Sequence, residues 1–411
     1  MKLSPISGLT LRLKVAASSA PRLAFTFGCL CAPAWLLAAA YFATAHGRLD
    51  FANLAVGRDF VIVWTAAHLT AEGRVLDVFQ PAKFLVGARR LFDPALPFHF
   101  WSYPPTALLN VLWLGRLDYF TAYAAWCAAG LGGLLLSARA FFRDRWDIVL
   151  LMLSPAVATN LVFGQNGFIT AALLLAGFAL LERRPIVAGA VFGLLGFKPQ
   201  LGFLLPVALA SGRRWRAFAA AAVVVILVAA ISVAIFGVEA WRAFLDFTVP
   251  TQRLMMIGTG PFRLMTPAAF MSGLIVTGSP TKALVVQAPF TLLGVGLAWR
   301  AFRAGGDMQL RAAAVMVATF VASPQSFSYD LVPLAAAAVV MIRKSPTRTT
   351  GILAALLWIA PLLVIPLNAL ELPVAPLILA AAGLQLDRLL RSRAGAVGRQ
   401  GPHPRGPRMT A

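Results

Sequence analysis

Long apolar runs alternate with short polar segments along almost the whole chain. The first run, from about residue 23 to 45, exceeds the roughly twenty residues that a membrane helix needs, so it is predicted to be an uncleaved first span rather than a signal peptide. Further spans are predicted at 119–141, 147–163, 167–182, 185–198, 200–212, 216–236, 283–302, 309–323, 329–342, 350–367 and 372–390. The pattern therefore predicts an all-α polytopic membrane protein with about twelve transmembrane helices.

Basic residues in the short loops indicate how these helices are oriented, because lysine and arginine concentrate on the cytoplasmic side. With a cytoplasmic amino terminus, the short inner loops hold fourteen lysines and arginines, whereas the short outer loops hold only Lys198. This orientation requires Tyr103–Gly115, which is short for a span and contains two prolines near its start, to be a helix lying in the outer interface. Both termini are thus predicted to face the cytoplasm, in an inner or plasma membrane.

A single integral-membrane domain is predicted over residues 1–390, because the bilayer imposes one bundle of helices. It includes a large extracytoplasmic loop with interfacial helices at 46–118 and a second outer loop near 237–282. Residues 391–411 are rich in arginine, glycine and proline and have no apolar period. They are predicted to form a disordered cytoplasmic tail that touches anionic membrane lipids.

Composition and charge narrow the classes of function. The chain is 60% hydrophobic and 12% charged, with a mean hydropathy of +0.79. Its net charge of +21 comes from short clusters between apolar runs, so no nucleic acid partner is expected. The three cysteines and four histidines lack the spacing of metal ligands, and the chain has neither a Walker-type phosphate loop nor a dinucleotide fingerprint. We therefore expect no metal site and no cofactor.

Four polar positions fall on the predicted outer side, where ionisable groups are costly and are functional candidates by default. They are Asp59 after the first span and three short motifs, namely "FGQNG" at 163–167, "FKPQ" at 197–200 and "SPQSFSYD" at 323–330. Because all four lie at outer ends of apolar runs, they predict a site on that face.

Asp59 precedes an apolar stripe at helical spacing, so two interpretations stand side by side. A carboxylate at a helix amino terminus is the ordinary capping arrangement. A carboxylate held where lipid-borne substrates meet water can also act as a general base.

Cations and amides at the other positions carry similar pairs of interpretations. Lys198 suits a phosphate ligand, or else pairs with a carboxylate or snorkels outward. Arg263 is a weaker phosphate candidate, in a loop where it is equally expected to be solvated. Gln165 and Asn166 suit sugar hydroxyls or a phosphate oxygen, although the glycines beside them are typical of a tight turn. Tyr329 and Asp330 lie at a helix entrance, where capping and anchoring are the alternative to ligand binding.

Taken in order, these motifs resemble glycosyltransferase family 87, the DUF2029-type transferases of the GT-C class. The resemblance covers roughly residues 20–340 and is most specific in "GQNGFITAALLLAGFALLERRPIVAGAVFGLLGFKPQLGFLLPVAL". It implies a GT-C-like fold, an extracytoplasmic active site and a polyprenyl-phosphate-linked sugar donor, with mannose the expected sugar and a lipid or glycan the acceptor. By position, Asp59 matches the family's aspartate in the first outer loop and Lys198 the lysine of its K-P-Q motif.

One departure from the family concerns Gln325, which stands where the family frequently has histidine. Glutamine donates a hydrogen bond but carries no charge, so the histidine's role is missing or altered here. Despite this departure, the resemblance implies a hexosyltransferase, which we predict to act with inversion. A transporter or flippase for a lipid-linked sugar, or a noncatalytic subunit, remains as the alternative.

Overall fold

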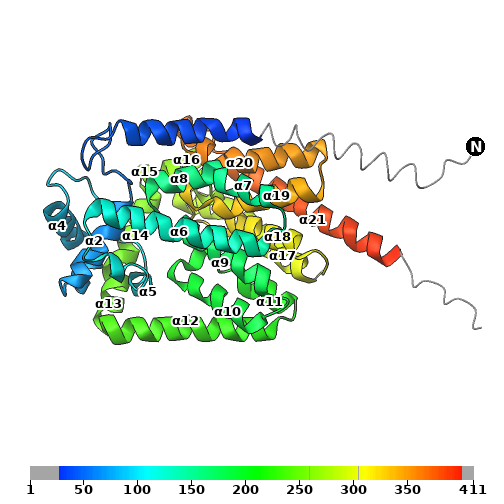
Figure 1. Ribbon diagram of the computed structural model, residues 1–411, viewed down its shortest axis with the longest axis horizontal. Helices are drawn as coiled ribbons and strands as arrows, with labels where there is room; N and C mark the ends of the chain where they lie inside the picture. Colours follow the sequence, from blue (N-terminus) through cyan, green and yellow to red (C-terminus); the bar gives the residue numbers. More distant parts are fainter. Residues whose placement is uncertain (1–26, 259, 304, 400–411) are drawn as a thin grey trace, which may run out of the picture.

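Helices form every regular element of the described chain. The computed structural model describes residues 27–258, 260–303 and 305–399. Its long helices run side by side, and a group of short helices that includes α2, α4, α5, α13 and α14 covers one end of the bundle, on the left in Figure 1. This covered end is formed by the two segments that the sequence assigns to outer loops.

The first third of the chain supplies one long helix and most of this cover. The elements are an apolar helix at Phe27–Ala43, α2 (Phe60–Ala71), α3 (Val75–Val78), α4 (Pro81–Leu91), α5 (Pro105–Leu108) and the 3₁₀ turn η1 (Leu112–Leu114). The segment predicted as one interfacial helix is thus two short pieces. Asn110 and Val111 donate backbone bonds to residues three positions earlier, so the chain forms tight turns there.

The middle of the chain alternates long helices with broken ones. The elements are α6 (Tyr119–Phe141), α7 (Arg145–Leu153), α8 (Pro155–Phe163), α9 (Gly167–Leu180), α10 (Pro185–Gly193), the 3₁₀ turns η2 (Leu194–Phe197) and η3 (Pro199–Leu201), α11 (Leu205–Ser211) and α12 (Trp215–Phe236). A Cβ atom at Gly189 would lie 2.2 Å from the carbonyl oxygen of Ala217. Helices α10 and α12 therefore pack closely because this position is glycine.

The last third completes the cover and then builds the centre of the bundle. The elements are α13 (Val238–Ala243), the π-helix η4 (Phe244–Thr248), α14 (Val249–Ile257), α15 (Pro261–Met265), α16 (Ala269–Thr277), α17 (Pro280–Arg303), α18 (Met308–Ala322), the 3₁₀ turn η5 (Ser328–Asp330), α19 (Val332–Lys344), α20 (Arg348–Ala369) and α21 (Ala375–Arg399). All residues from Leu310 to Ala322 in α18 and from Val332 to Met341 in α19 are buried. These two helices form the core.

Fewer described helices than predicted are long and apolar enough to cross a membrane. Four described helices, α6, α12, α17 and α20, are long and apolar enough to cross a membrane, and the pair α7 and α8, bent by 45° at a short break, makes a fifth if counted as one span. The structure supports a helical membrane protein but not the count of about twelve. Several predicted spans are short helices bounded by proline or glycine. Helix α10, before Lys198, begins at Pro185 and ends at Gly193, and α11, after Lys198, is followed by Gly212.

Both predicted chain ends fall partly outside the described residues. The basic residues before the first helix lie in residues 1–26, and the last part of the predicted tail lies in residues 400–411. Helix α21 continues to Arg399, beyond the predicted end of the last span at residue 390.

Candidate active site

Asp59 is held at the start of α2 by an unusual backbone loop. Gly57 has a φ of +80°, and a Cβ atom there would lie 2.7 Å from the Tyr123 ring, so this position requires glycine. The Tyr41 hydroxyl accepts a hydrogen bond of 2.9 Å from the Gly57 N–H and so fixes the loop to the first helix. The loop therefore sets where the Asp59 side chain projects.

The Asp59 carboxylate is not a helix cap. It makes no side-chain capping bond to α2. Instead, its Oδ2 atom accepts a hydrogen bond of 3.0 Å from Nε2 of Gln165, which lies 106 positions later in the chain. The capping interpretation of Asp59 is wrong, because the carboxylate points away from the free N–H groups of its own helix and towards the turn between α8 and α9.

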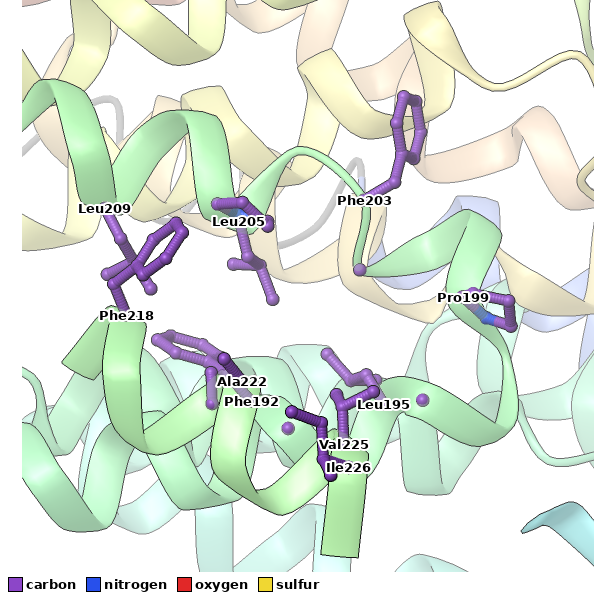
Figure 2. Close-up of a pocket in the computed structure, with 15 residues that line it drawn as sticks. Phe192, Leu195, Pro199, Phe203, Leu205, Leu209, Phe218, Ala222, Val225 and Ile226 are labelled. Atoms are coloured by element: carbon purple, nitrogen blue, oxygen red, sulfur yellow. The ribbon is translucent and has the colours of Figure 1, made fainter. Parts of the chain in front are cut away.

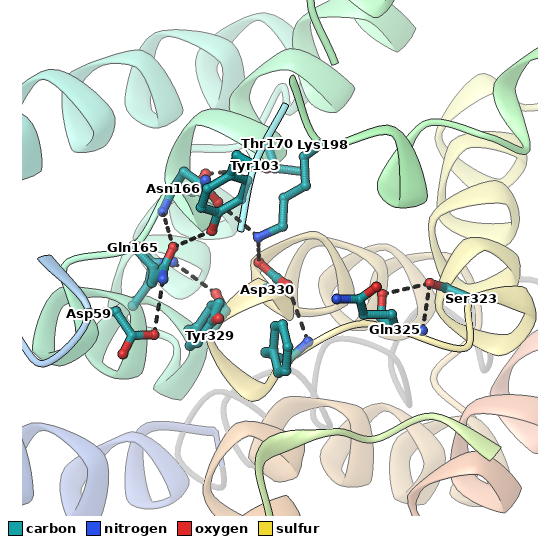
Figure 3. A network of polar contacts seen from close by, with 12 residues as sticks. Asp59, Tyr103, Gln165, Asn166, Thr170, Lys198, Ser323, Gln325, Tyr329 and Asp330 are labelled. Carbon is teal, nitrogen blue, oxygen red and sulfur yellow. Dashed lines mark hydrogen bonds and ion pairs between the residues drawn. The ribbon is translucent and has the colours of Figure 1, made fainter. Parts of the chain in front are cut away.

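That turn carries the two amides predicted for the site. Gly164 ends α8 with a φ of +58°, which reverses the chain and confirms the tight turn expected from its glycines. Gln165 then faces Asp59, while the Oδ1 atom of Asn166 accepts a hydrogen bond of 2.9 Å from Nζ of Lys198. The two neighbouring amides thus connect a carboxylate on one side to an ammonium on the other (Figure 3).

Lys198 forms a buried ion pair. Its Nζ atom lies 2.5 Å from Oδ1 of Asp330, and the two side chains are 1% and 0% exposed. The ammonium also lies 5.6 Å and 5.4 Å from the ring centroids of Tyr103 and Tyr329, within range of a cation–π interaction. The interpretation that Lys198 pairs with a carboxylate is confirmed.

Asp330 also organises the loop in front of α19. Its Oδ2 atom accepts a hydrogen bond of 3.2 Å from the Phe327 N–H, which confirms the capping interpretation for this residue. The Tyr329 carbonyl accepts a hydrogen bond of 2.8 Å from Nδ2 of Asn160. Gln325 precedes Asp330 in the same loop, where its carbonyl accepts a hydrogen bond from the Ser323 hydroxyl and its N–H donates one to that hydroxyl (Figure 3).

Arg263 lies outside this network. Its Nη2 atom is 3.4 Å from Oε1 of Glu371, and no contact between Arg263 and the network occurs among the described residues. The side chain of Glu371 is 72% exposed. Such an exposed pair contributes little to stability and opens readily.

The two carboxylates of the network differ in their electrostatic surroundings. Asp330 is compensated by Lys198, whereas Asp59 has no ion-pair partner among the described residues and is half-buried. Desolvation raises the pKa of Asp59, and the hydrogen bond from Gln165 opposes that rise. Asp59 is therefore the less compensated of the two carboxylates. Within the described part of the chain, no group of three His, Cys, Asp or Glu side chains is placed to hold a metal ion.

Sequence analysis missed several residues of the site. The Tyr103 hydroxyl donates a hydrogen bond of 2.8 Å to Oε1 of Gln165, and Asn160 supports Tyr329 as described. The hydroxyls of Ser326 and Ser328 and the indole N–H of Trp101 are buried without a partner in the described structure. A tyrosine within an apolar run is itself a clue, because a buried hydroxyl usually needs a partner.

Two apolar cavities are lined in part by residues next to members of the network or of the Asp59 loop. One, of about 410 Å³, lies between α10, α11 and α12 and is lined by apolar residues such as Phe192, Leu195 and Val225 together with Pro199, the neighbour of Lys198 (Figure 2). A second, of about 350 Å³, is lined by residues of the first helix, α8 and α20, including Tyr41 and Phe163. Both are suited to apolar chains.

Comparison with known proteins supports the resemblance seen in the motifs. The model of glycosyltransferase family 87 matches residues 101–324, more than half of the chain. This match includes Tyr103, Gln165, Asn166 and Lys198, while Asp59 and Asp330 lie on either side of it. Searches of curated proteins and of solved structures gave no match. The chain belongs to glycosyltransferase family 87 and is a membrane glycosyltransferase.

Proposed function

We propose that the protein transfers a hexose, mannose, from a polyprenyl-phosphate donor to a lipid or glycan acceptor at the extracytoplasmic face, with inversion. The observation that carries this proposal is the network in which Gln165 holds a half-buried carboxylate, Asp59, at the covered end of the bundle. Membership of a glycosyltransferase family favours this function over the transporter and scaffold alternatives.

The proposed reaction is a single displacement. The acceptor hydroxyl gives its proton to Asp59 as its oxygen bonds to the anomeric carbon. The bond between that carbon and the phosphate oxygen breaks, and the polyprenyl phosphate leaves with the electron pair. Attack opposite the leaving group inverts the anomeric configuration.

The donor phosphate is proposed to bind at the Lys198 end of the network. The ammonium has three N–H donors, and Asp330 and Asn166 occupy two of them. Gln325, from the same loop as Asp330, would add an amide donor, and the Tyr329 ring centroid lies 5.4 Å from the Lys198 ammonium. Arg263 would join them once its exposed pair with Glu371 opens. Cations and amides in this position stabilise charge on the departing phosphate.

The two apolar cavities support lipid-linked substrates. The cavity between α10, α11 and α12 adjoins Pro199, so a chain attached to a phosphate near Lys198 can continue into it. The cavity beside Tyr41 and Phe163 lies near the Asp59 loop, where a lipid acceptor would present its hydroxyl.

Filling the first cavity should impair the use of long-chain donors. Ala222 lines it and Val223 does not, although both are exposed on α12. We expect Ala222→Trp to raise KM roughly tenfold or more for a long-chain donor and to leave KM for a short-chain analogue unchanged, because only the long chain loses apolar contacts. The measurement is KM in detergent for donors of graded chain length.

Val223→Trp is the matched control and should keep the wild-type KM for every donor. Equal KM values for Ala222→Trp and the wild-type protein with long-chain donors would exclude this cavity as the chain site.

The proposed orientation predicts which surface positions are reached from outside the cell. A cysteine at Arg74, at the start of α3, should be labelled in intact cells by a membrane-impermeant maleimide, and one at Arg214, at the start of α12, should not. The background carries Cys29→Ala, because Cys29 is exposed. Labelling of the cysteine at Arg214 with none at Arg74 would show that the orientation is the opposite of the one proposed.

A further inference from the structure

Gln165 uses both ends of its amide, which fixes its orientation. Its Oε1 atom accepts from the Tyr103 hydroxyl at 2.8 Å and from the Asn166 backbone N–H at 3.4 Å. A backbone N–H only donates, so the atom facing it must be the oxygen. The Nε2 atom is thereby directed at Asp59 Oδ2, 3.0 Å away.

Tyr103 is itself rigidly placed. The residue is 7% exposed, its ring centroid lies 5.6 Å from the Lys198 ammonium, and the Trp101 ring contacts it with 5.1 Å between the ring centroids. Pro104 follows it and begins the turn into α5. The hydroxyl therefore has little freedom to leave Gln165.

We propose that Tyr103 is a positioning residue for sugar transfer, which acts through the Gln165 amide to hold the Asp59 carboxylate towards the acceptor. This inference rests on the proposed role of Asp59 as the base. One carboxylate oxygen, Oδ2, is held by the amide, and the other takes the proton. Neither Tyr103 nor Gln165 needs to touch the sugar.

The hydrogen bonds from Tyr103 to Gln165 and from Gln165 to Asp59 form a relay. This relay also sets the pH below which the Asp59 carboxylate becomes protonated and no longer acts as a base. Desolvation raises the pKa of Asp59 and the Gln165 bond lowers it. The other charged or titratable groups around Asp59 are Arg58, His99, Lys198, Tyr103, Tyr119 and Tyr329. If the amide turns away, the stabilisation of the carboxylate is lost and the pKa rises further. Transfer requires the carboxylate, so activity then disappears at a higher pH as the solution is acidified.

The test is the dependence of kcat/KM on pH in Tyr103→Phe. We expect the acidic limb to move up by about one pH unit, the order expected when a hydrogen bond to an ionised group is lost. Donor binding should be unchanged. Gln165→Leu removes the amide that donates a hydrogen bond to Asp59, so it should move the acidic limb at least as far. The relay is thus tested by two variants with different risks to folding.

The matched control is Tyr123→Phe, which also loses a buried hydroxyl, in this case one that donates to the Leu161 carbonyl. Its limb should stay at the wild-type position. If the acidic limb of kcat/KM stays at the wild-type pH in both Tyr103→Phe and Gln165→Leu, the positioning role of Tyr103 is wrong, while the proposed role of Asp59 as the base is unaffected. Wild-type turnover with an unchanged acidic limb in Asp59→Asn would instead show that Asp59 is not the titrating base, and the proposed mechanism would fail.

Discussion

Asp59→Asn should reduce sugar transfer by about a hundredfold to ten-thousandfold, the usual cost of removing a general base. Asparagine has nearly the same shape as aspartate, and its side-chain oxygen can still accept the hydrogen bond from Gln165. It cannot take the acceptor's proton. The Asp59 side chain makes no cap to α2, so the loss cannot be attributed to the start of that helix. The measurement is kcat with saturating donor, together with donor affinity, which should stay near the wild-type value.

Asp118→Asn is the matched control for this substitution. Asp118 is also an aspartate in the first outer loop, where its carboxylate accepts a hydrogen bond of 3.2 Å from the Thr121 N–H at the start of α6. Asparagine caps a helix about as well as aspartate, so this variant should transfer at the wild-type rate. Wild-type turnover in Asp59→Asn would leave the proposed reaction without its base.

Lys198→Met should destabilise the protein by about 3–5 kcal/mol, because it leaves the Asp330 carboxylate buried without its cation. The measurement is thermal unfolding of the purified protein in detergent. Lys198→Met/Asp330→Asn removes both charges and keeps an acceptor for the Phe327 N–H, so most of the lost stability should return.

Activity in the double variant separates the structural role of Lys198 from its role towards the donor. We expect a folded protein with a raised KM for the donor, because the ammonium proposed to face the phosphate is absent. Lys198→Arg keeps the charge with another geometry and should retain part of the activity. Normal donor use by the double variant would make Lys198 purely structural, and a fully stable Lys198→Met would contradict the buried ion pair.

Much of the helical framework was predictable because most helices coincide with a continuous apolar run. The predicted segment 119–141 has the same limits as α6, and 216–236 differs from α12 by one residue. The number of spans was not predictable from hydropathy. Helices α18 and α19 are apolar on all sides because other helices surround them, and burial in protein requires the same composition as burial in lipid.

The polar site was predictable in outline for a related reason. Gln165, Lys198 and Asp330 each lie where an apolar run ends on the predicted outer side. Helix ends on the same side of a bundle lie close together, so these residues were expected to share a site. Their pairing was not predictable, because Lys198 and Asp330 are 132 positions apart and only the packing of α9 against both α10 and α19 brings them together. The role of Tyr103 depends on the orientation of one amide, which no sequence pattern reports.

The protein is proposed to use a polyprenyl-phosphate sugar and to invert the anomeric carbon. The direct measurement incubates purified protein with a panel of isotope-labelled polyprenyl-phosphate hexoses, membrane lipid acceptors and, in parallel, nucleotide sugars, and determines the anomeric configuration of the product by NMR. Polyprenyl-phosphate mannose is expected to give a product of inverted configuration, with Asp59→Asn as the inactive comparison. Transfer from a nucleotide sugar alone, or retention of configuration, would contradict the account.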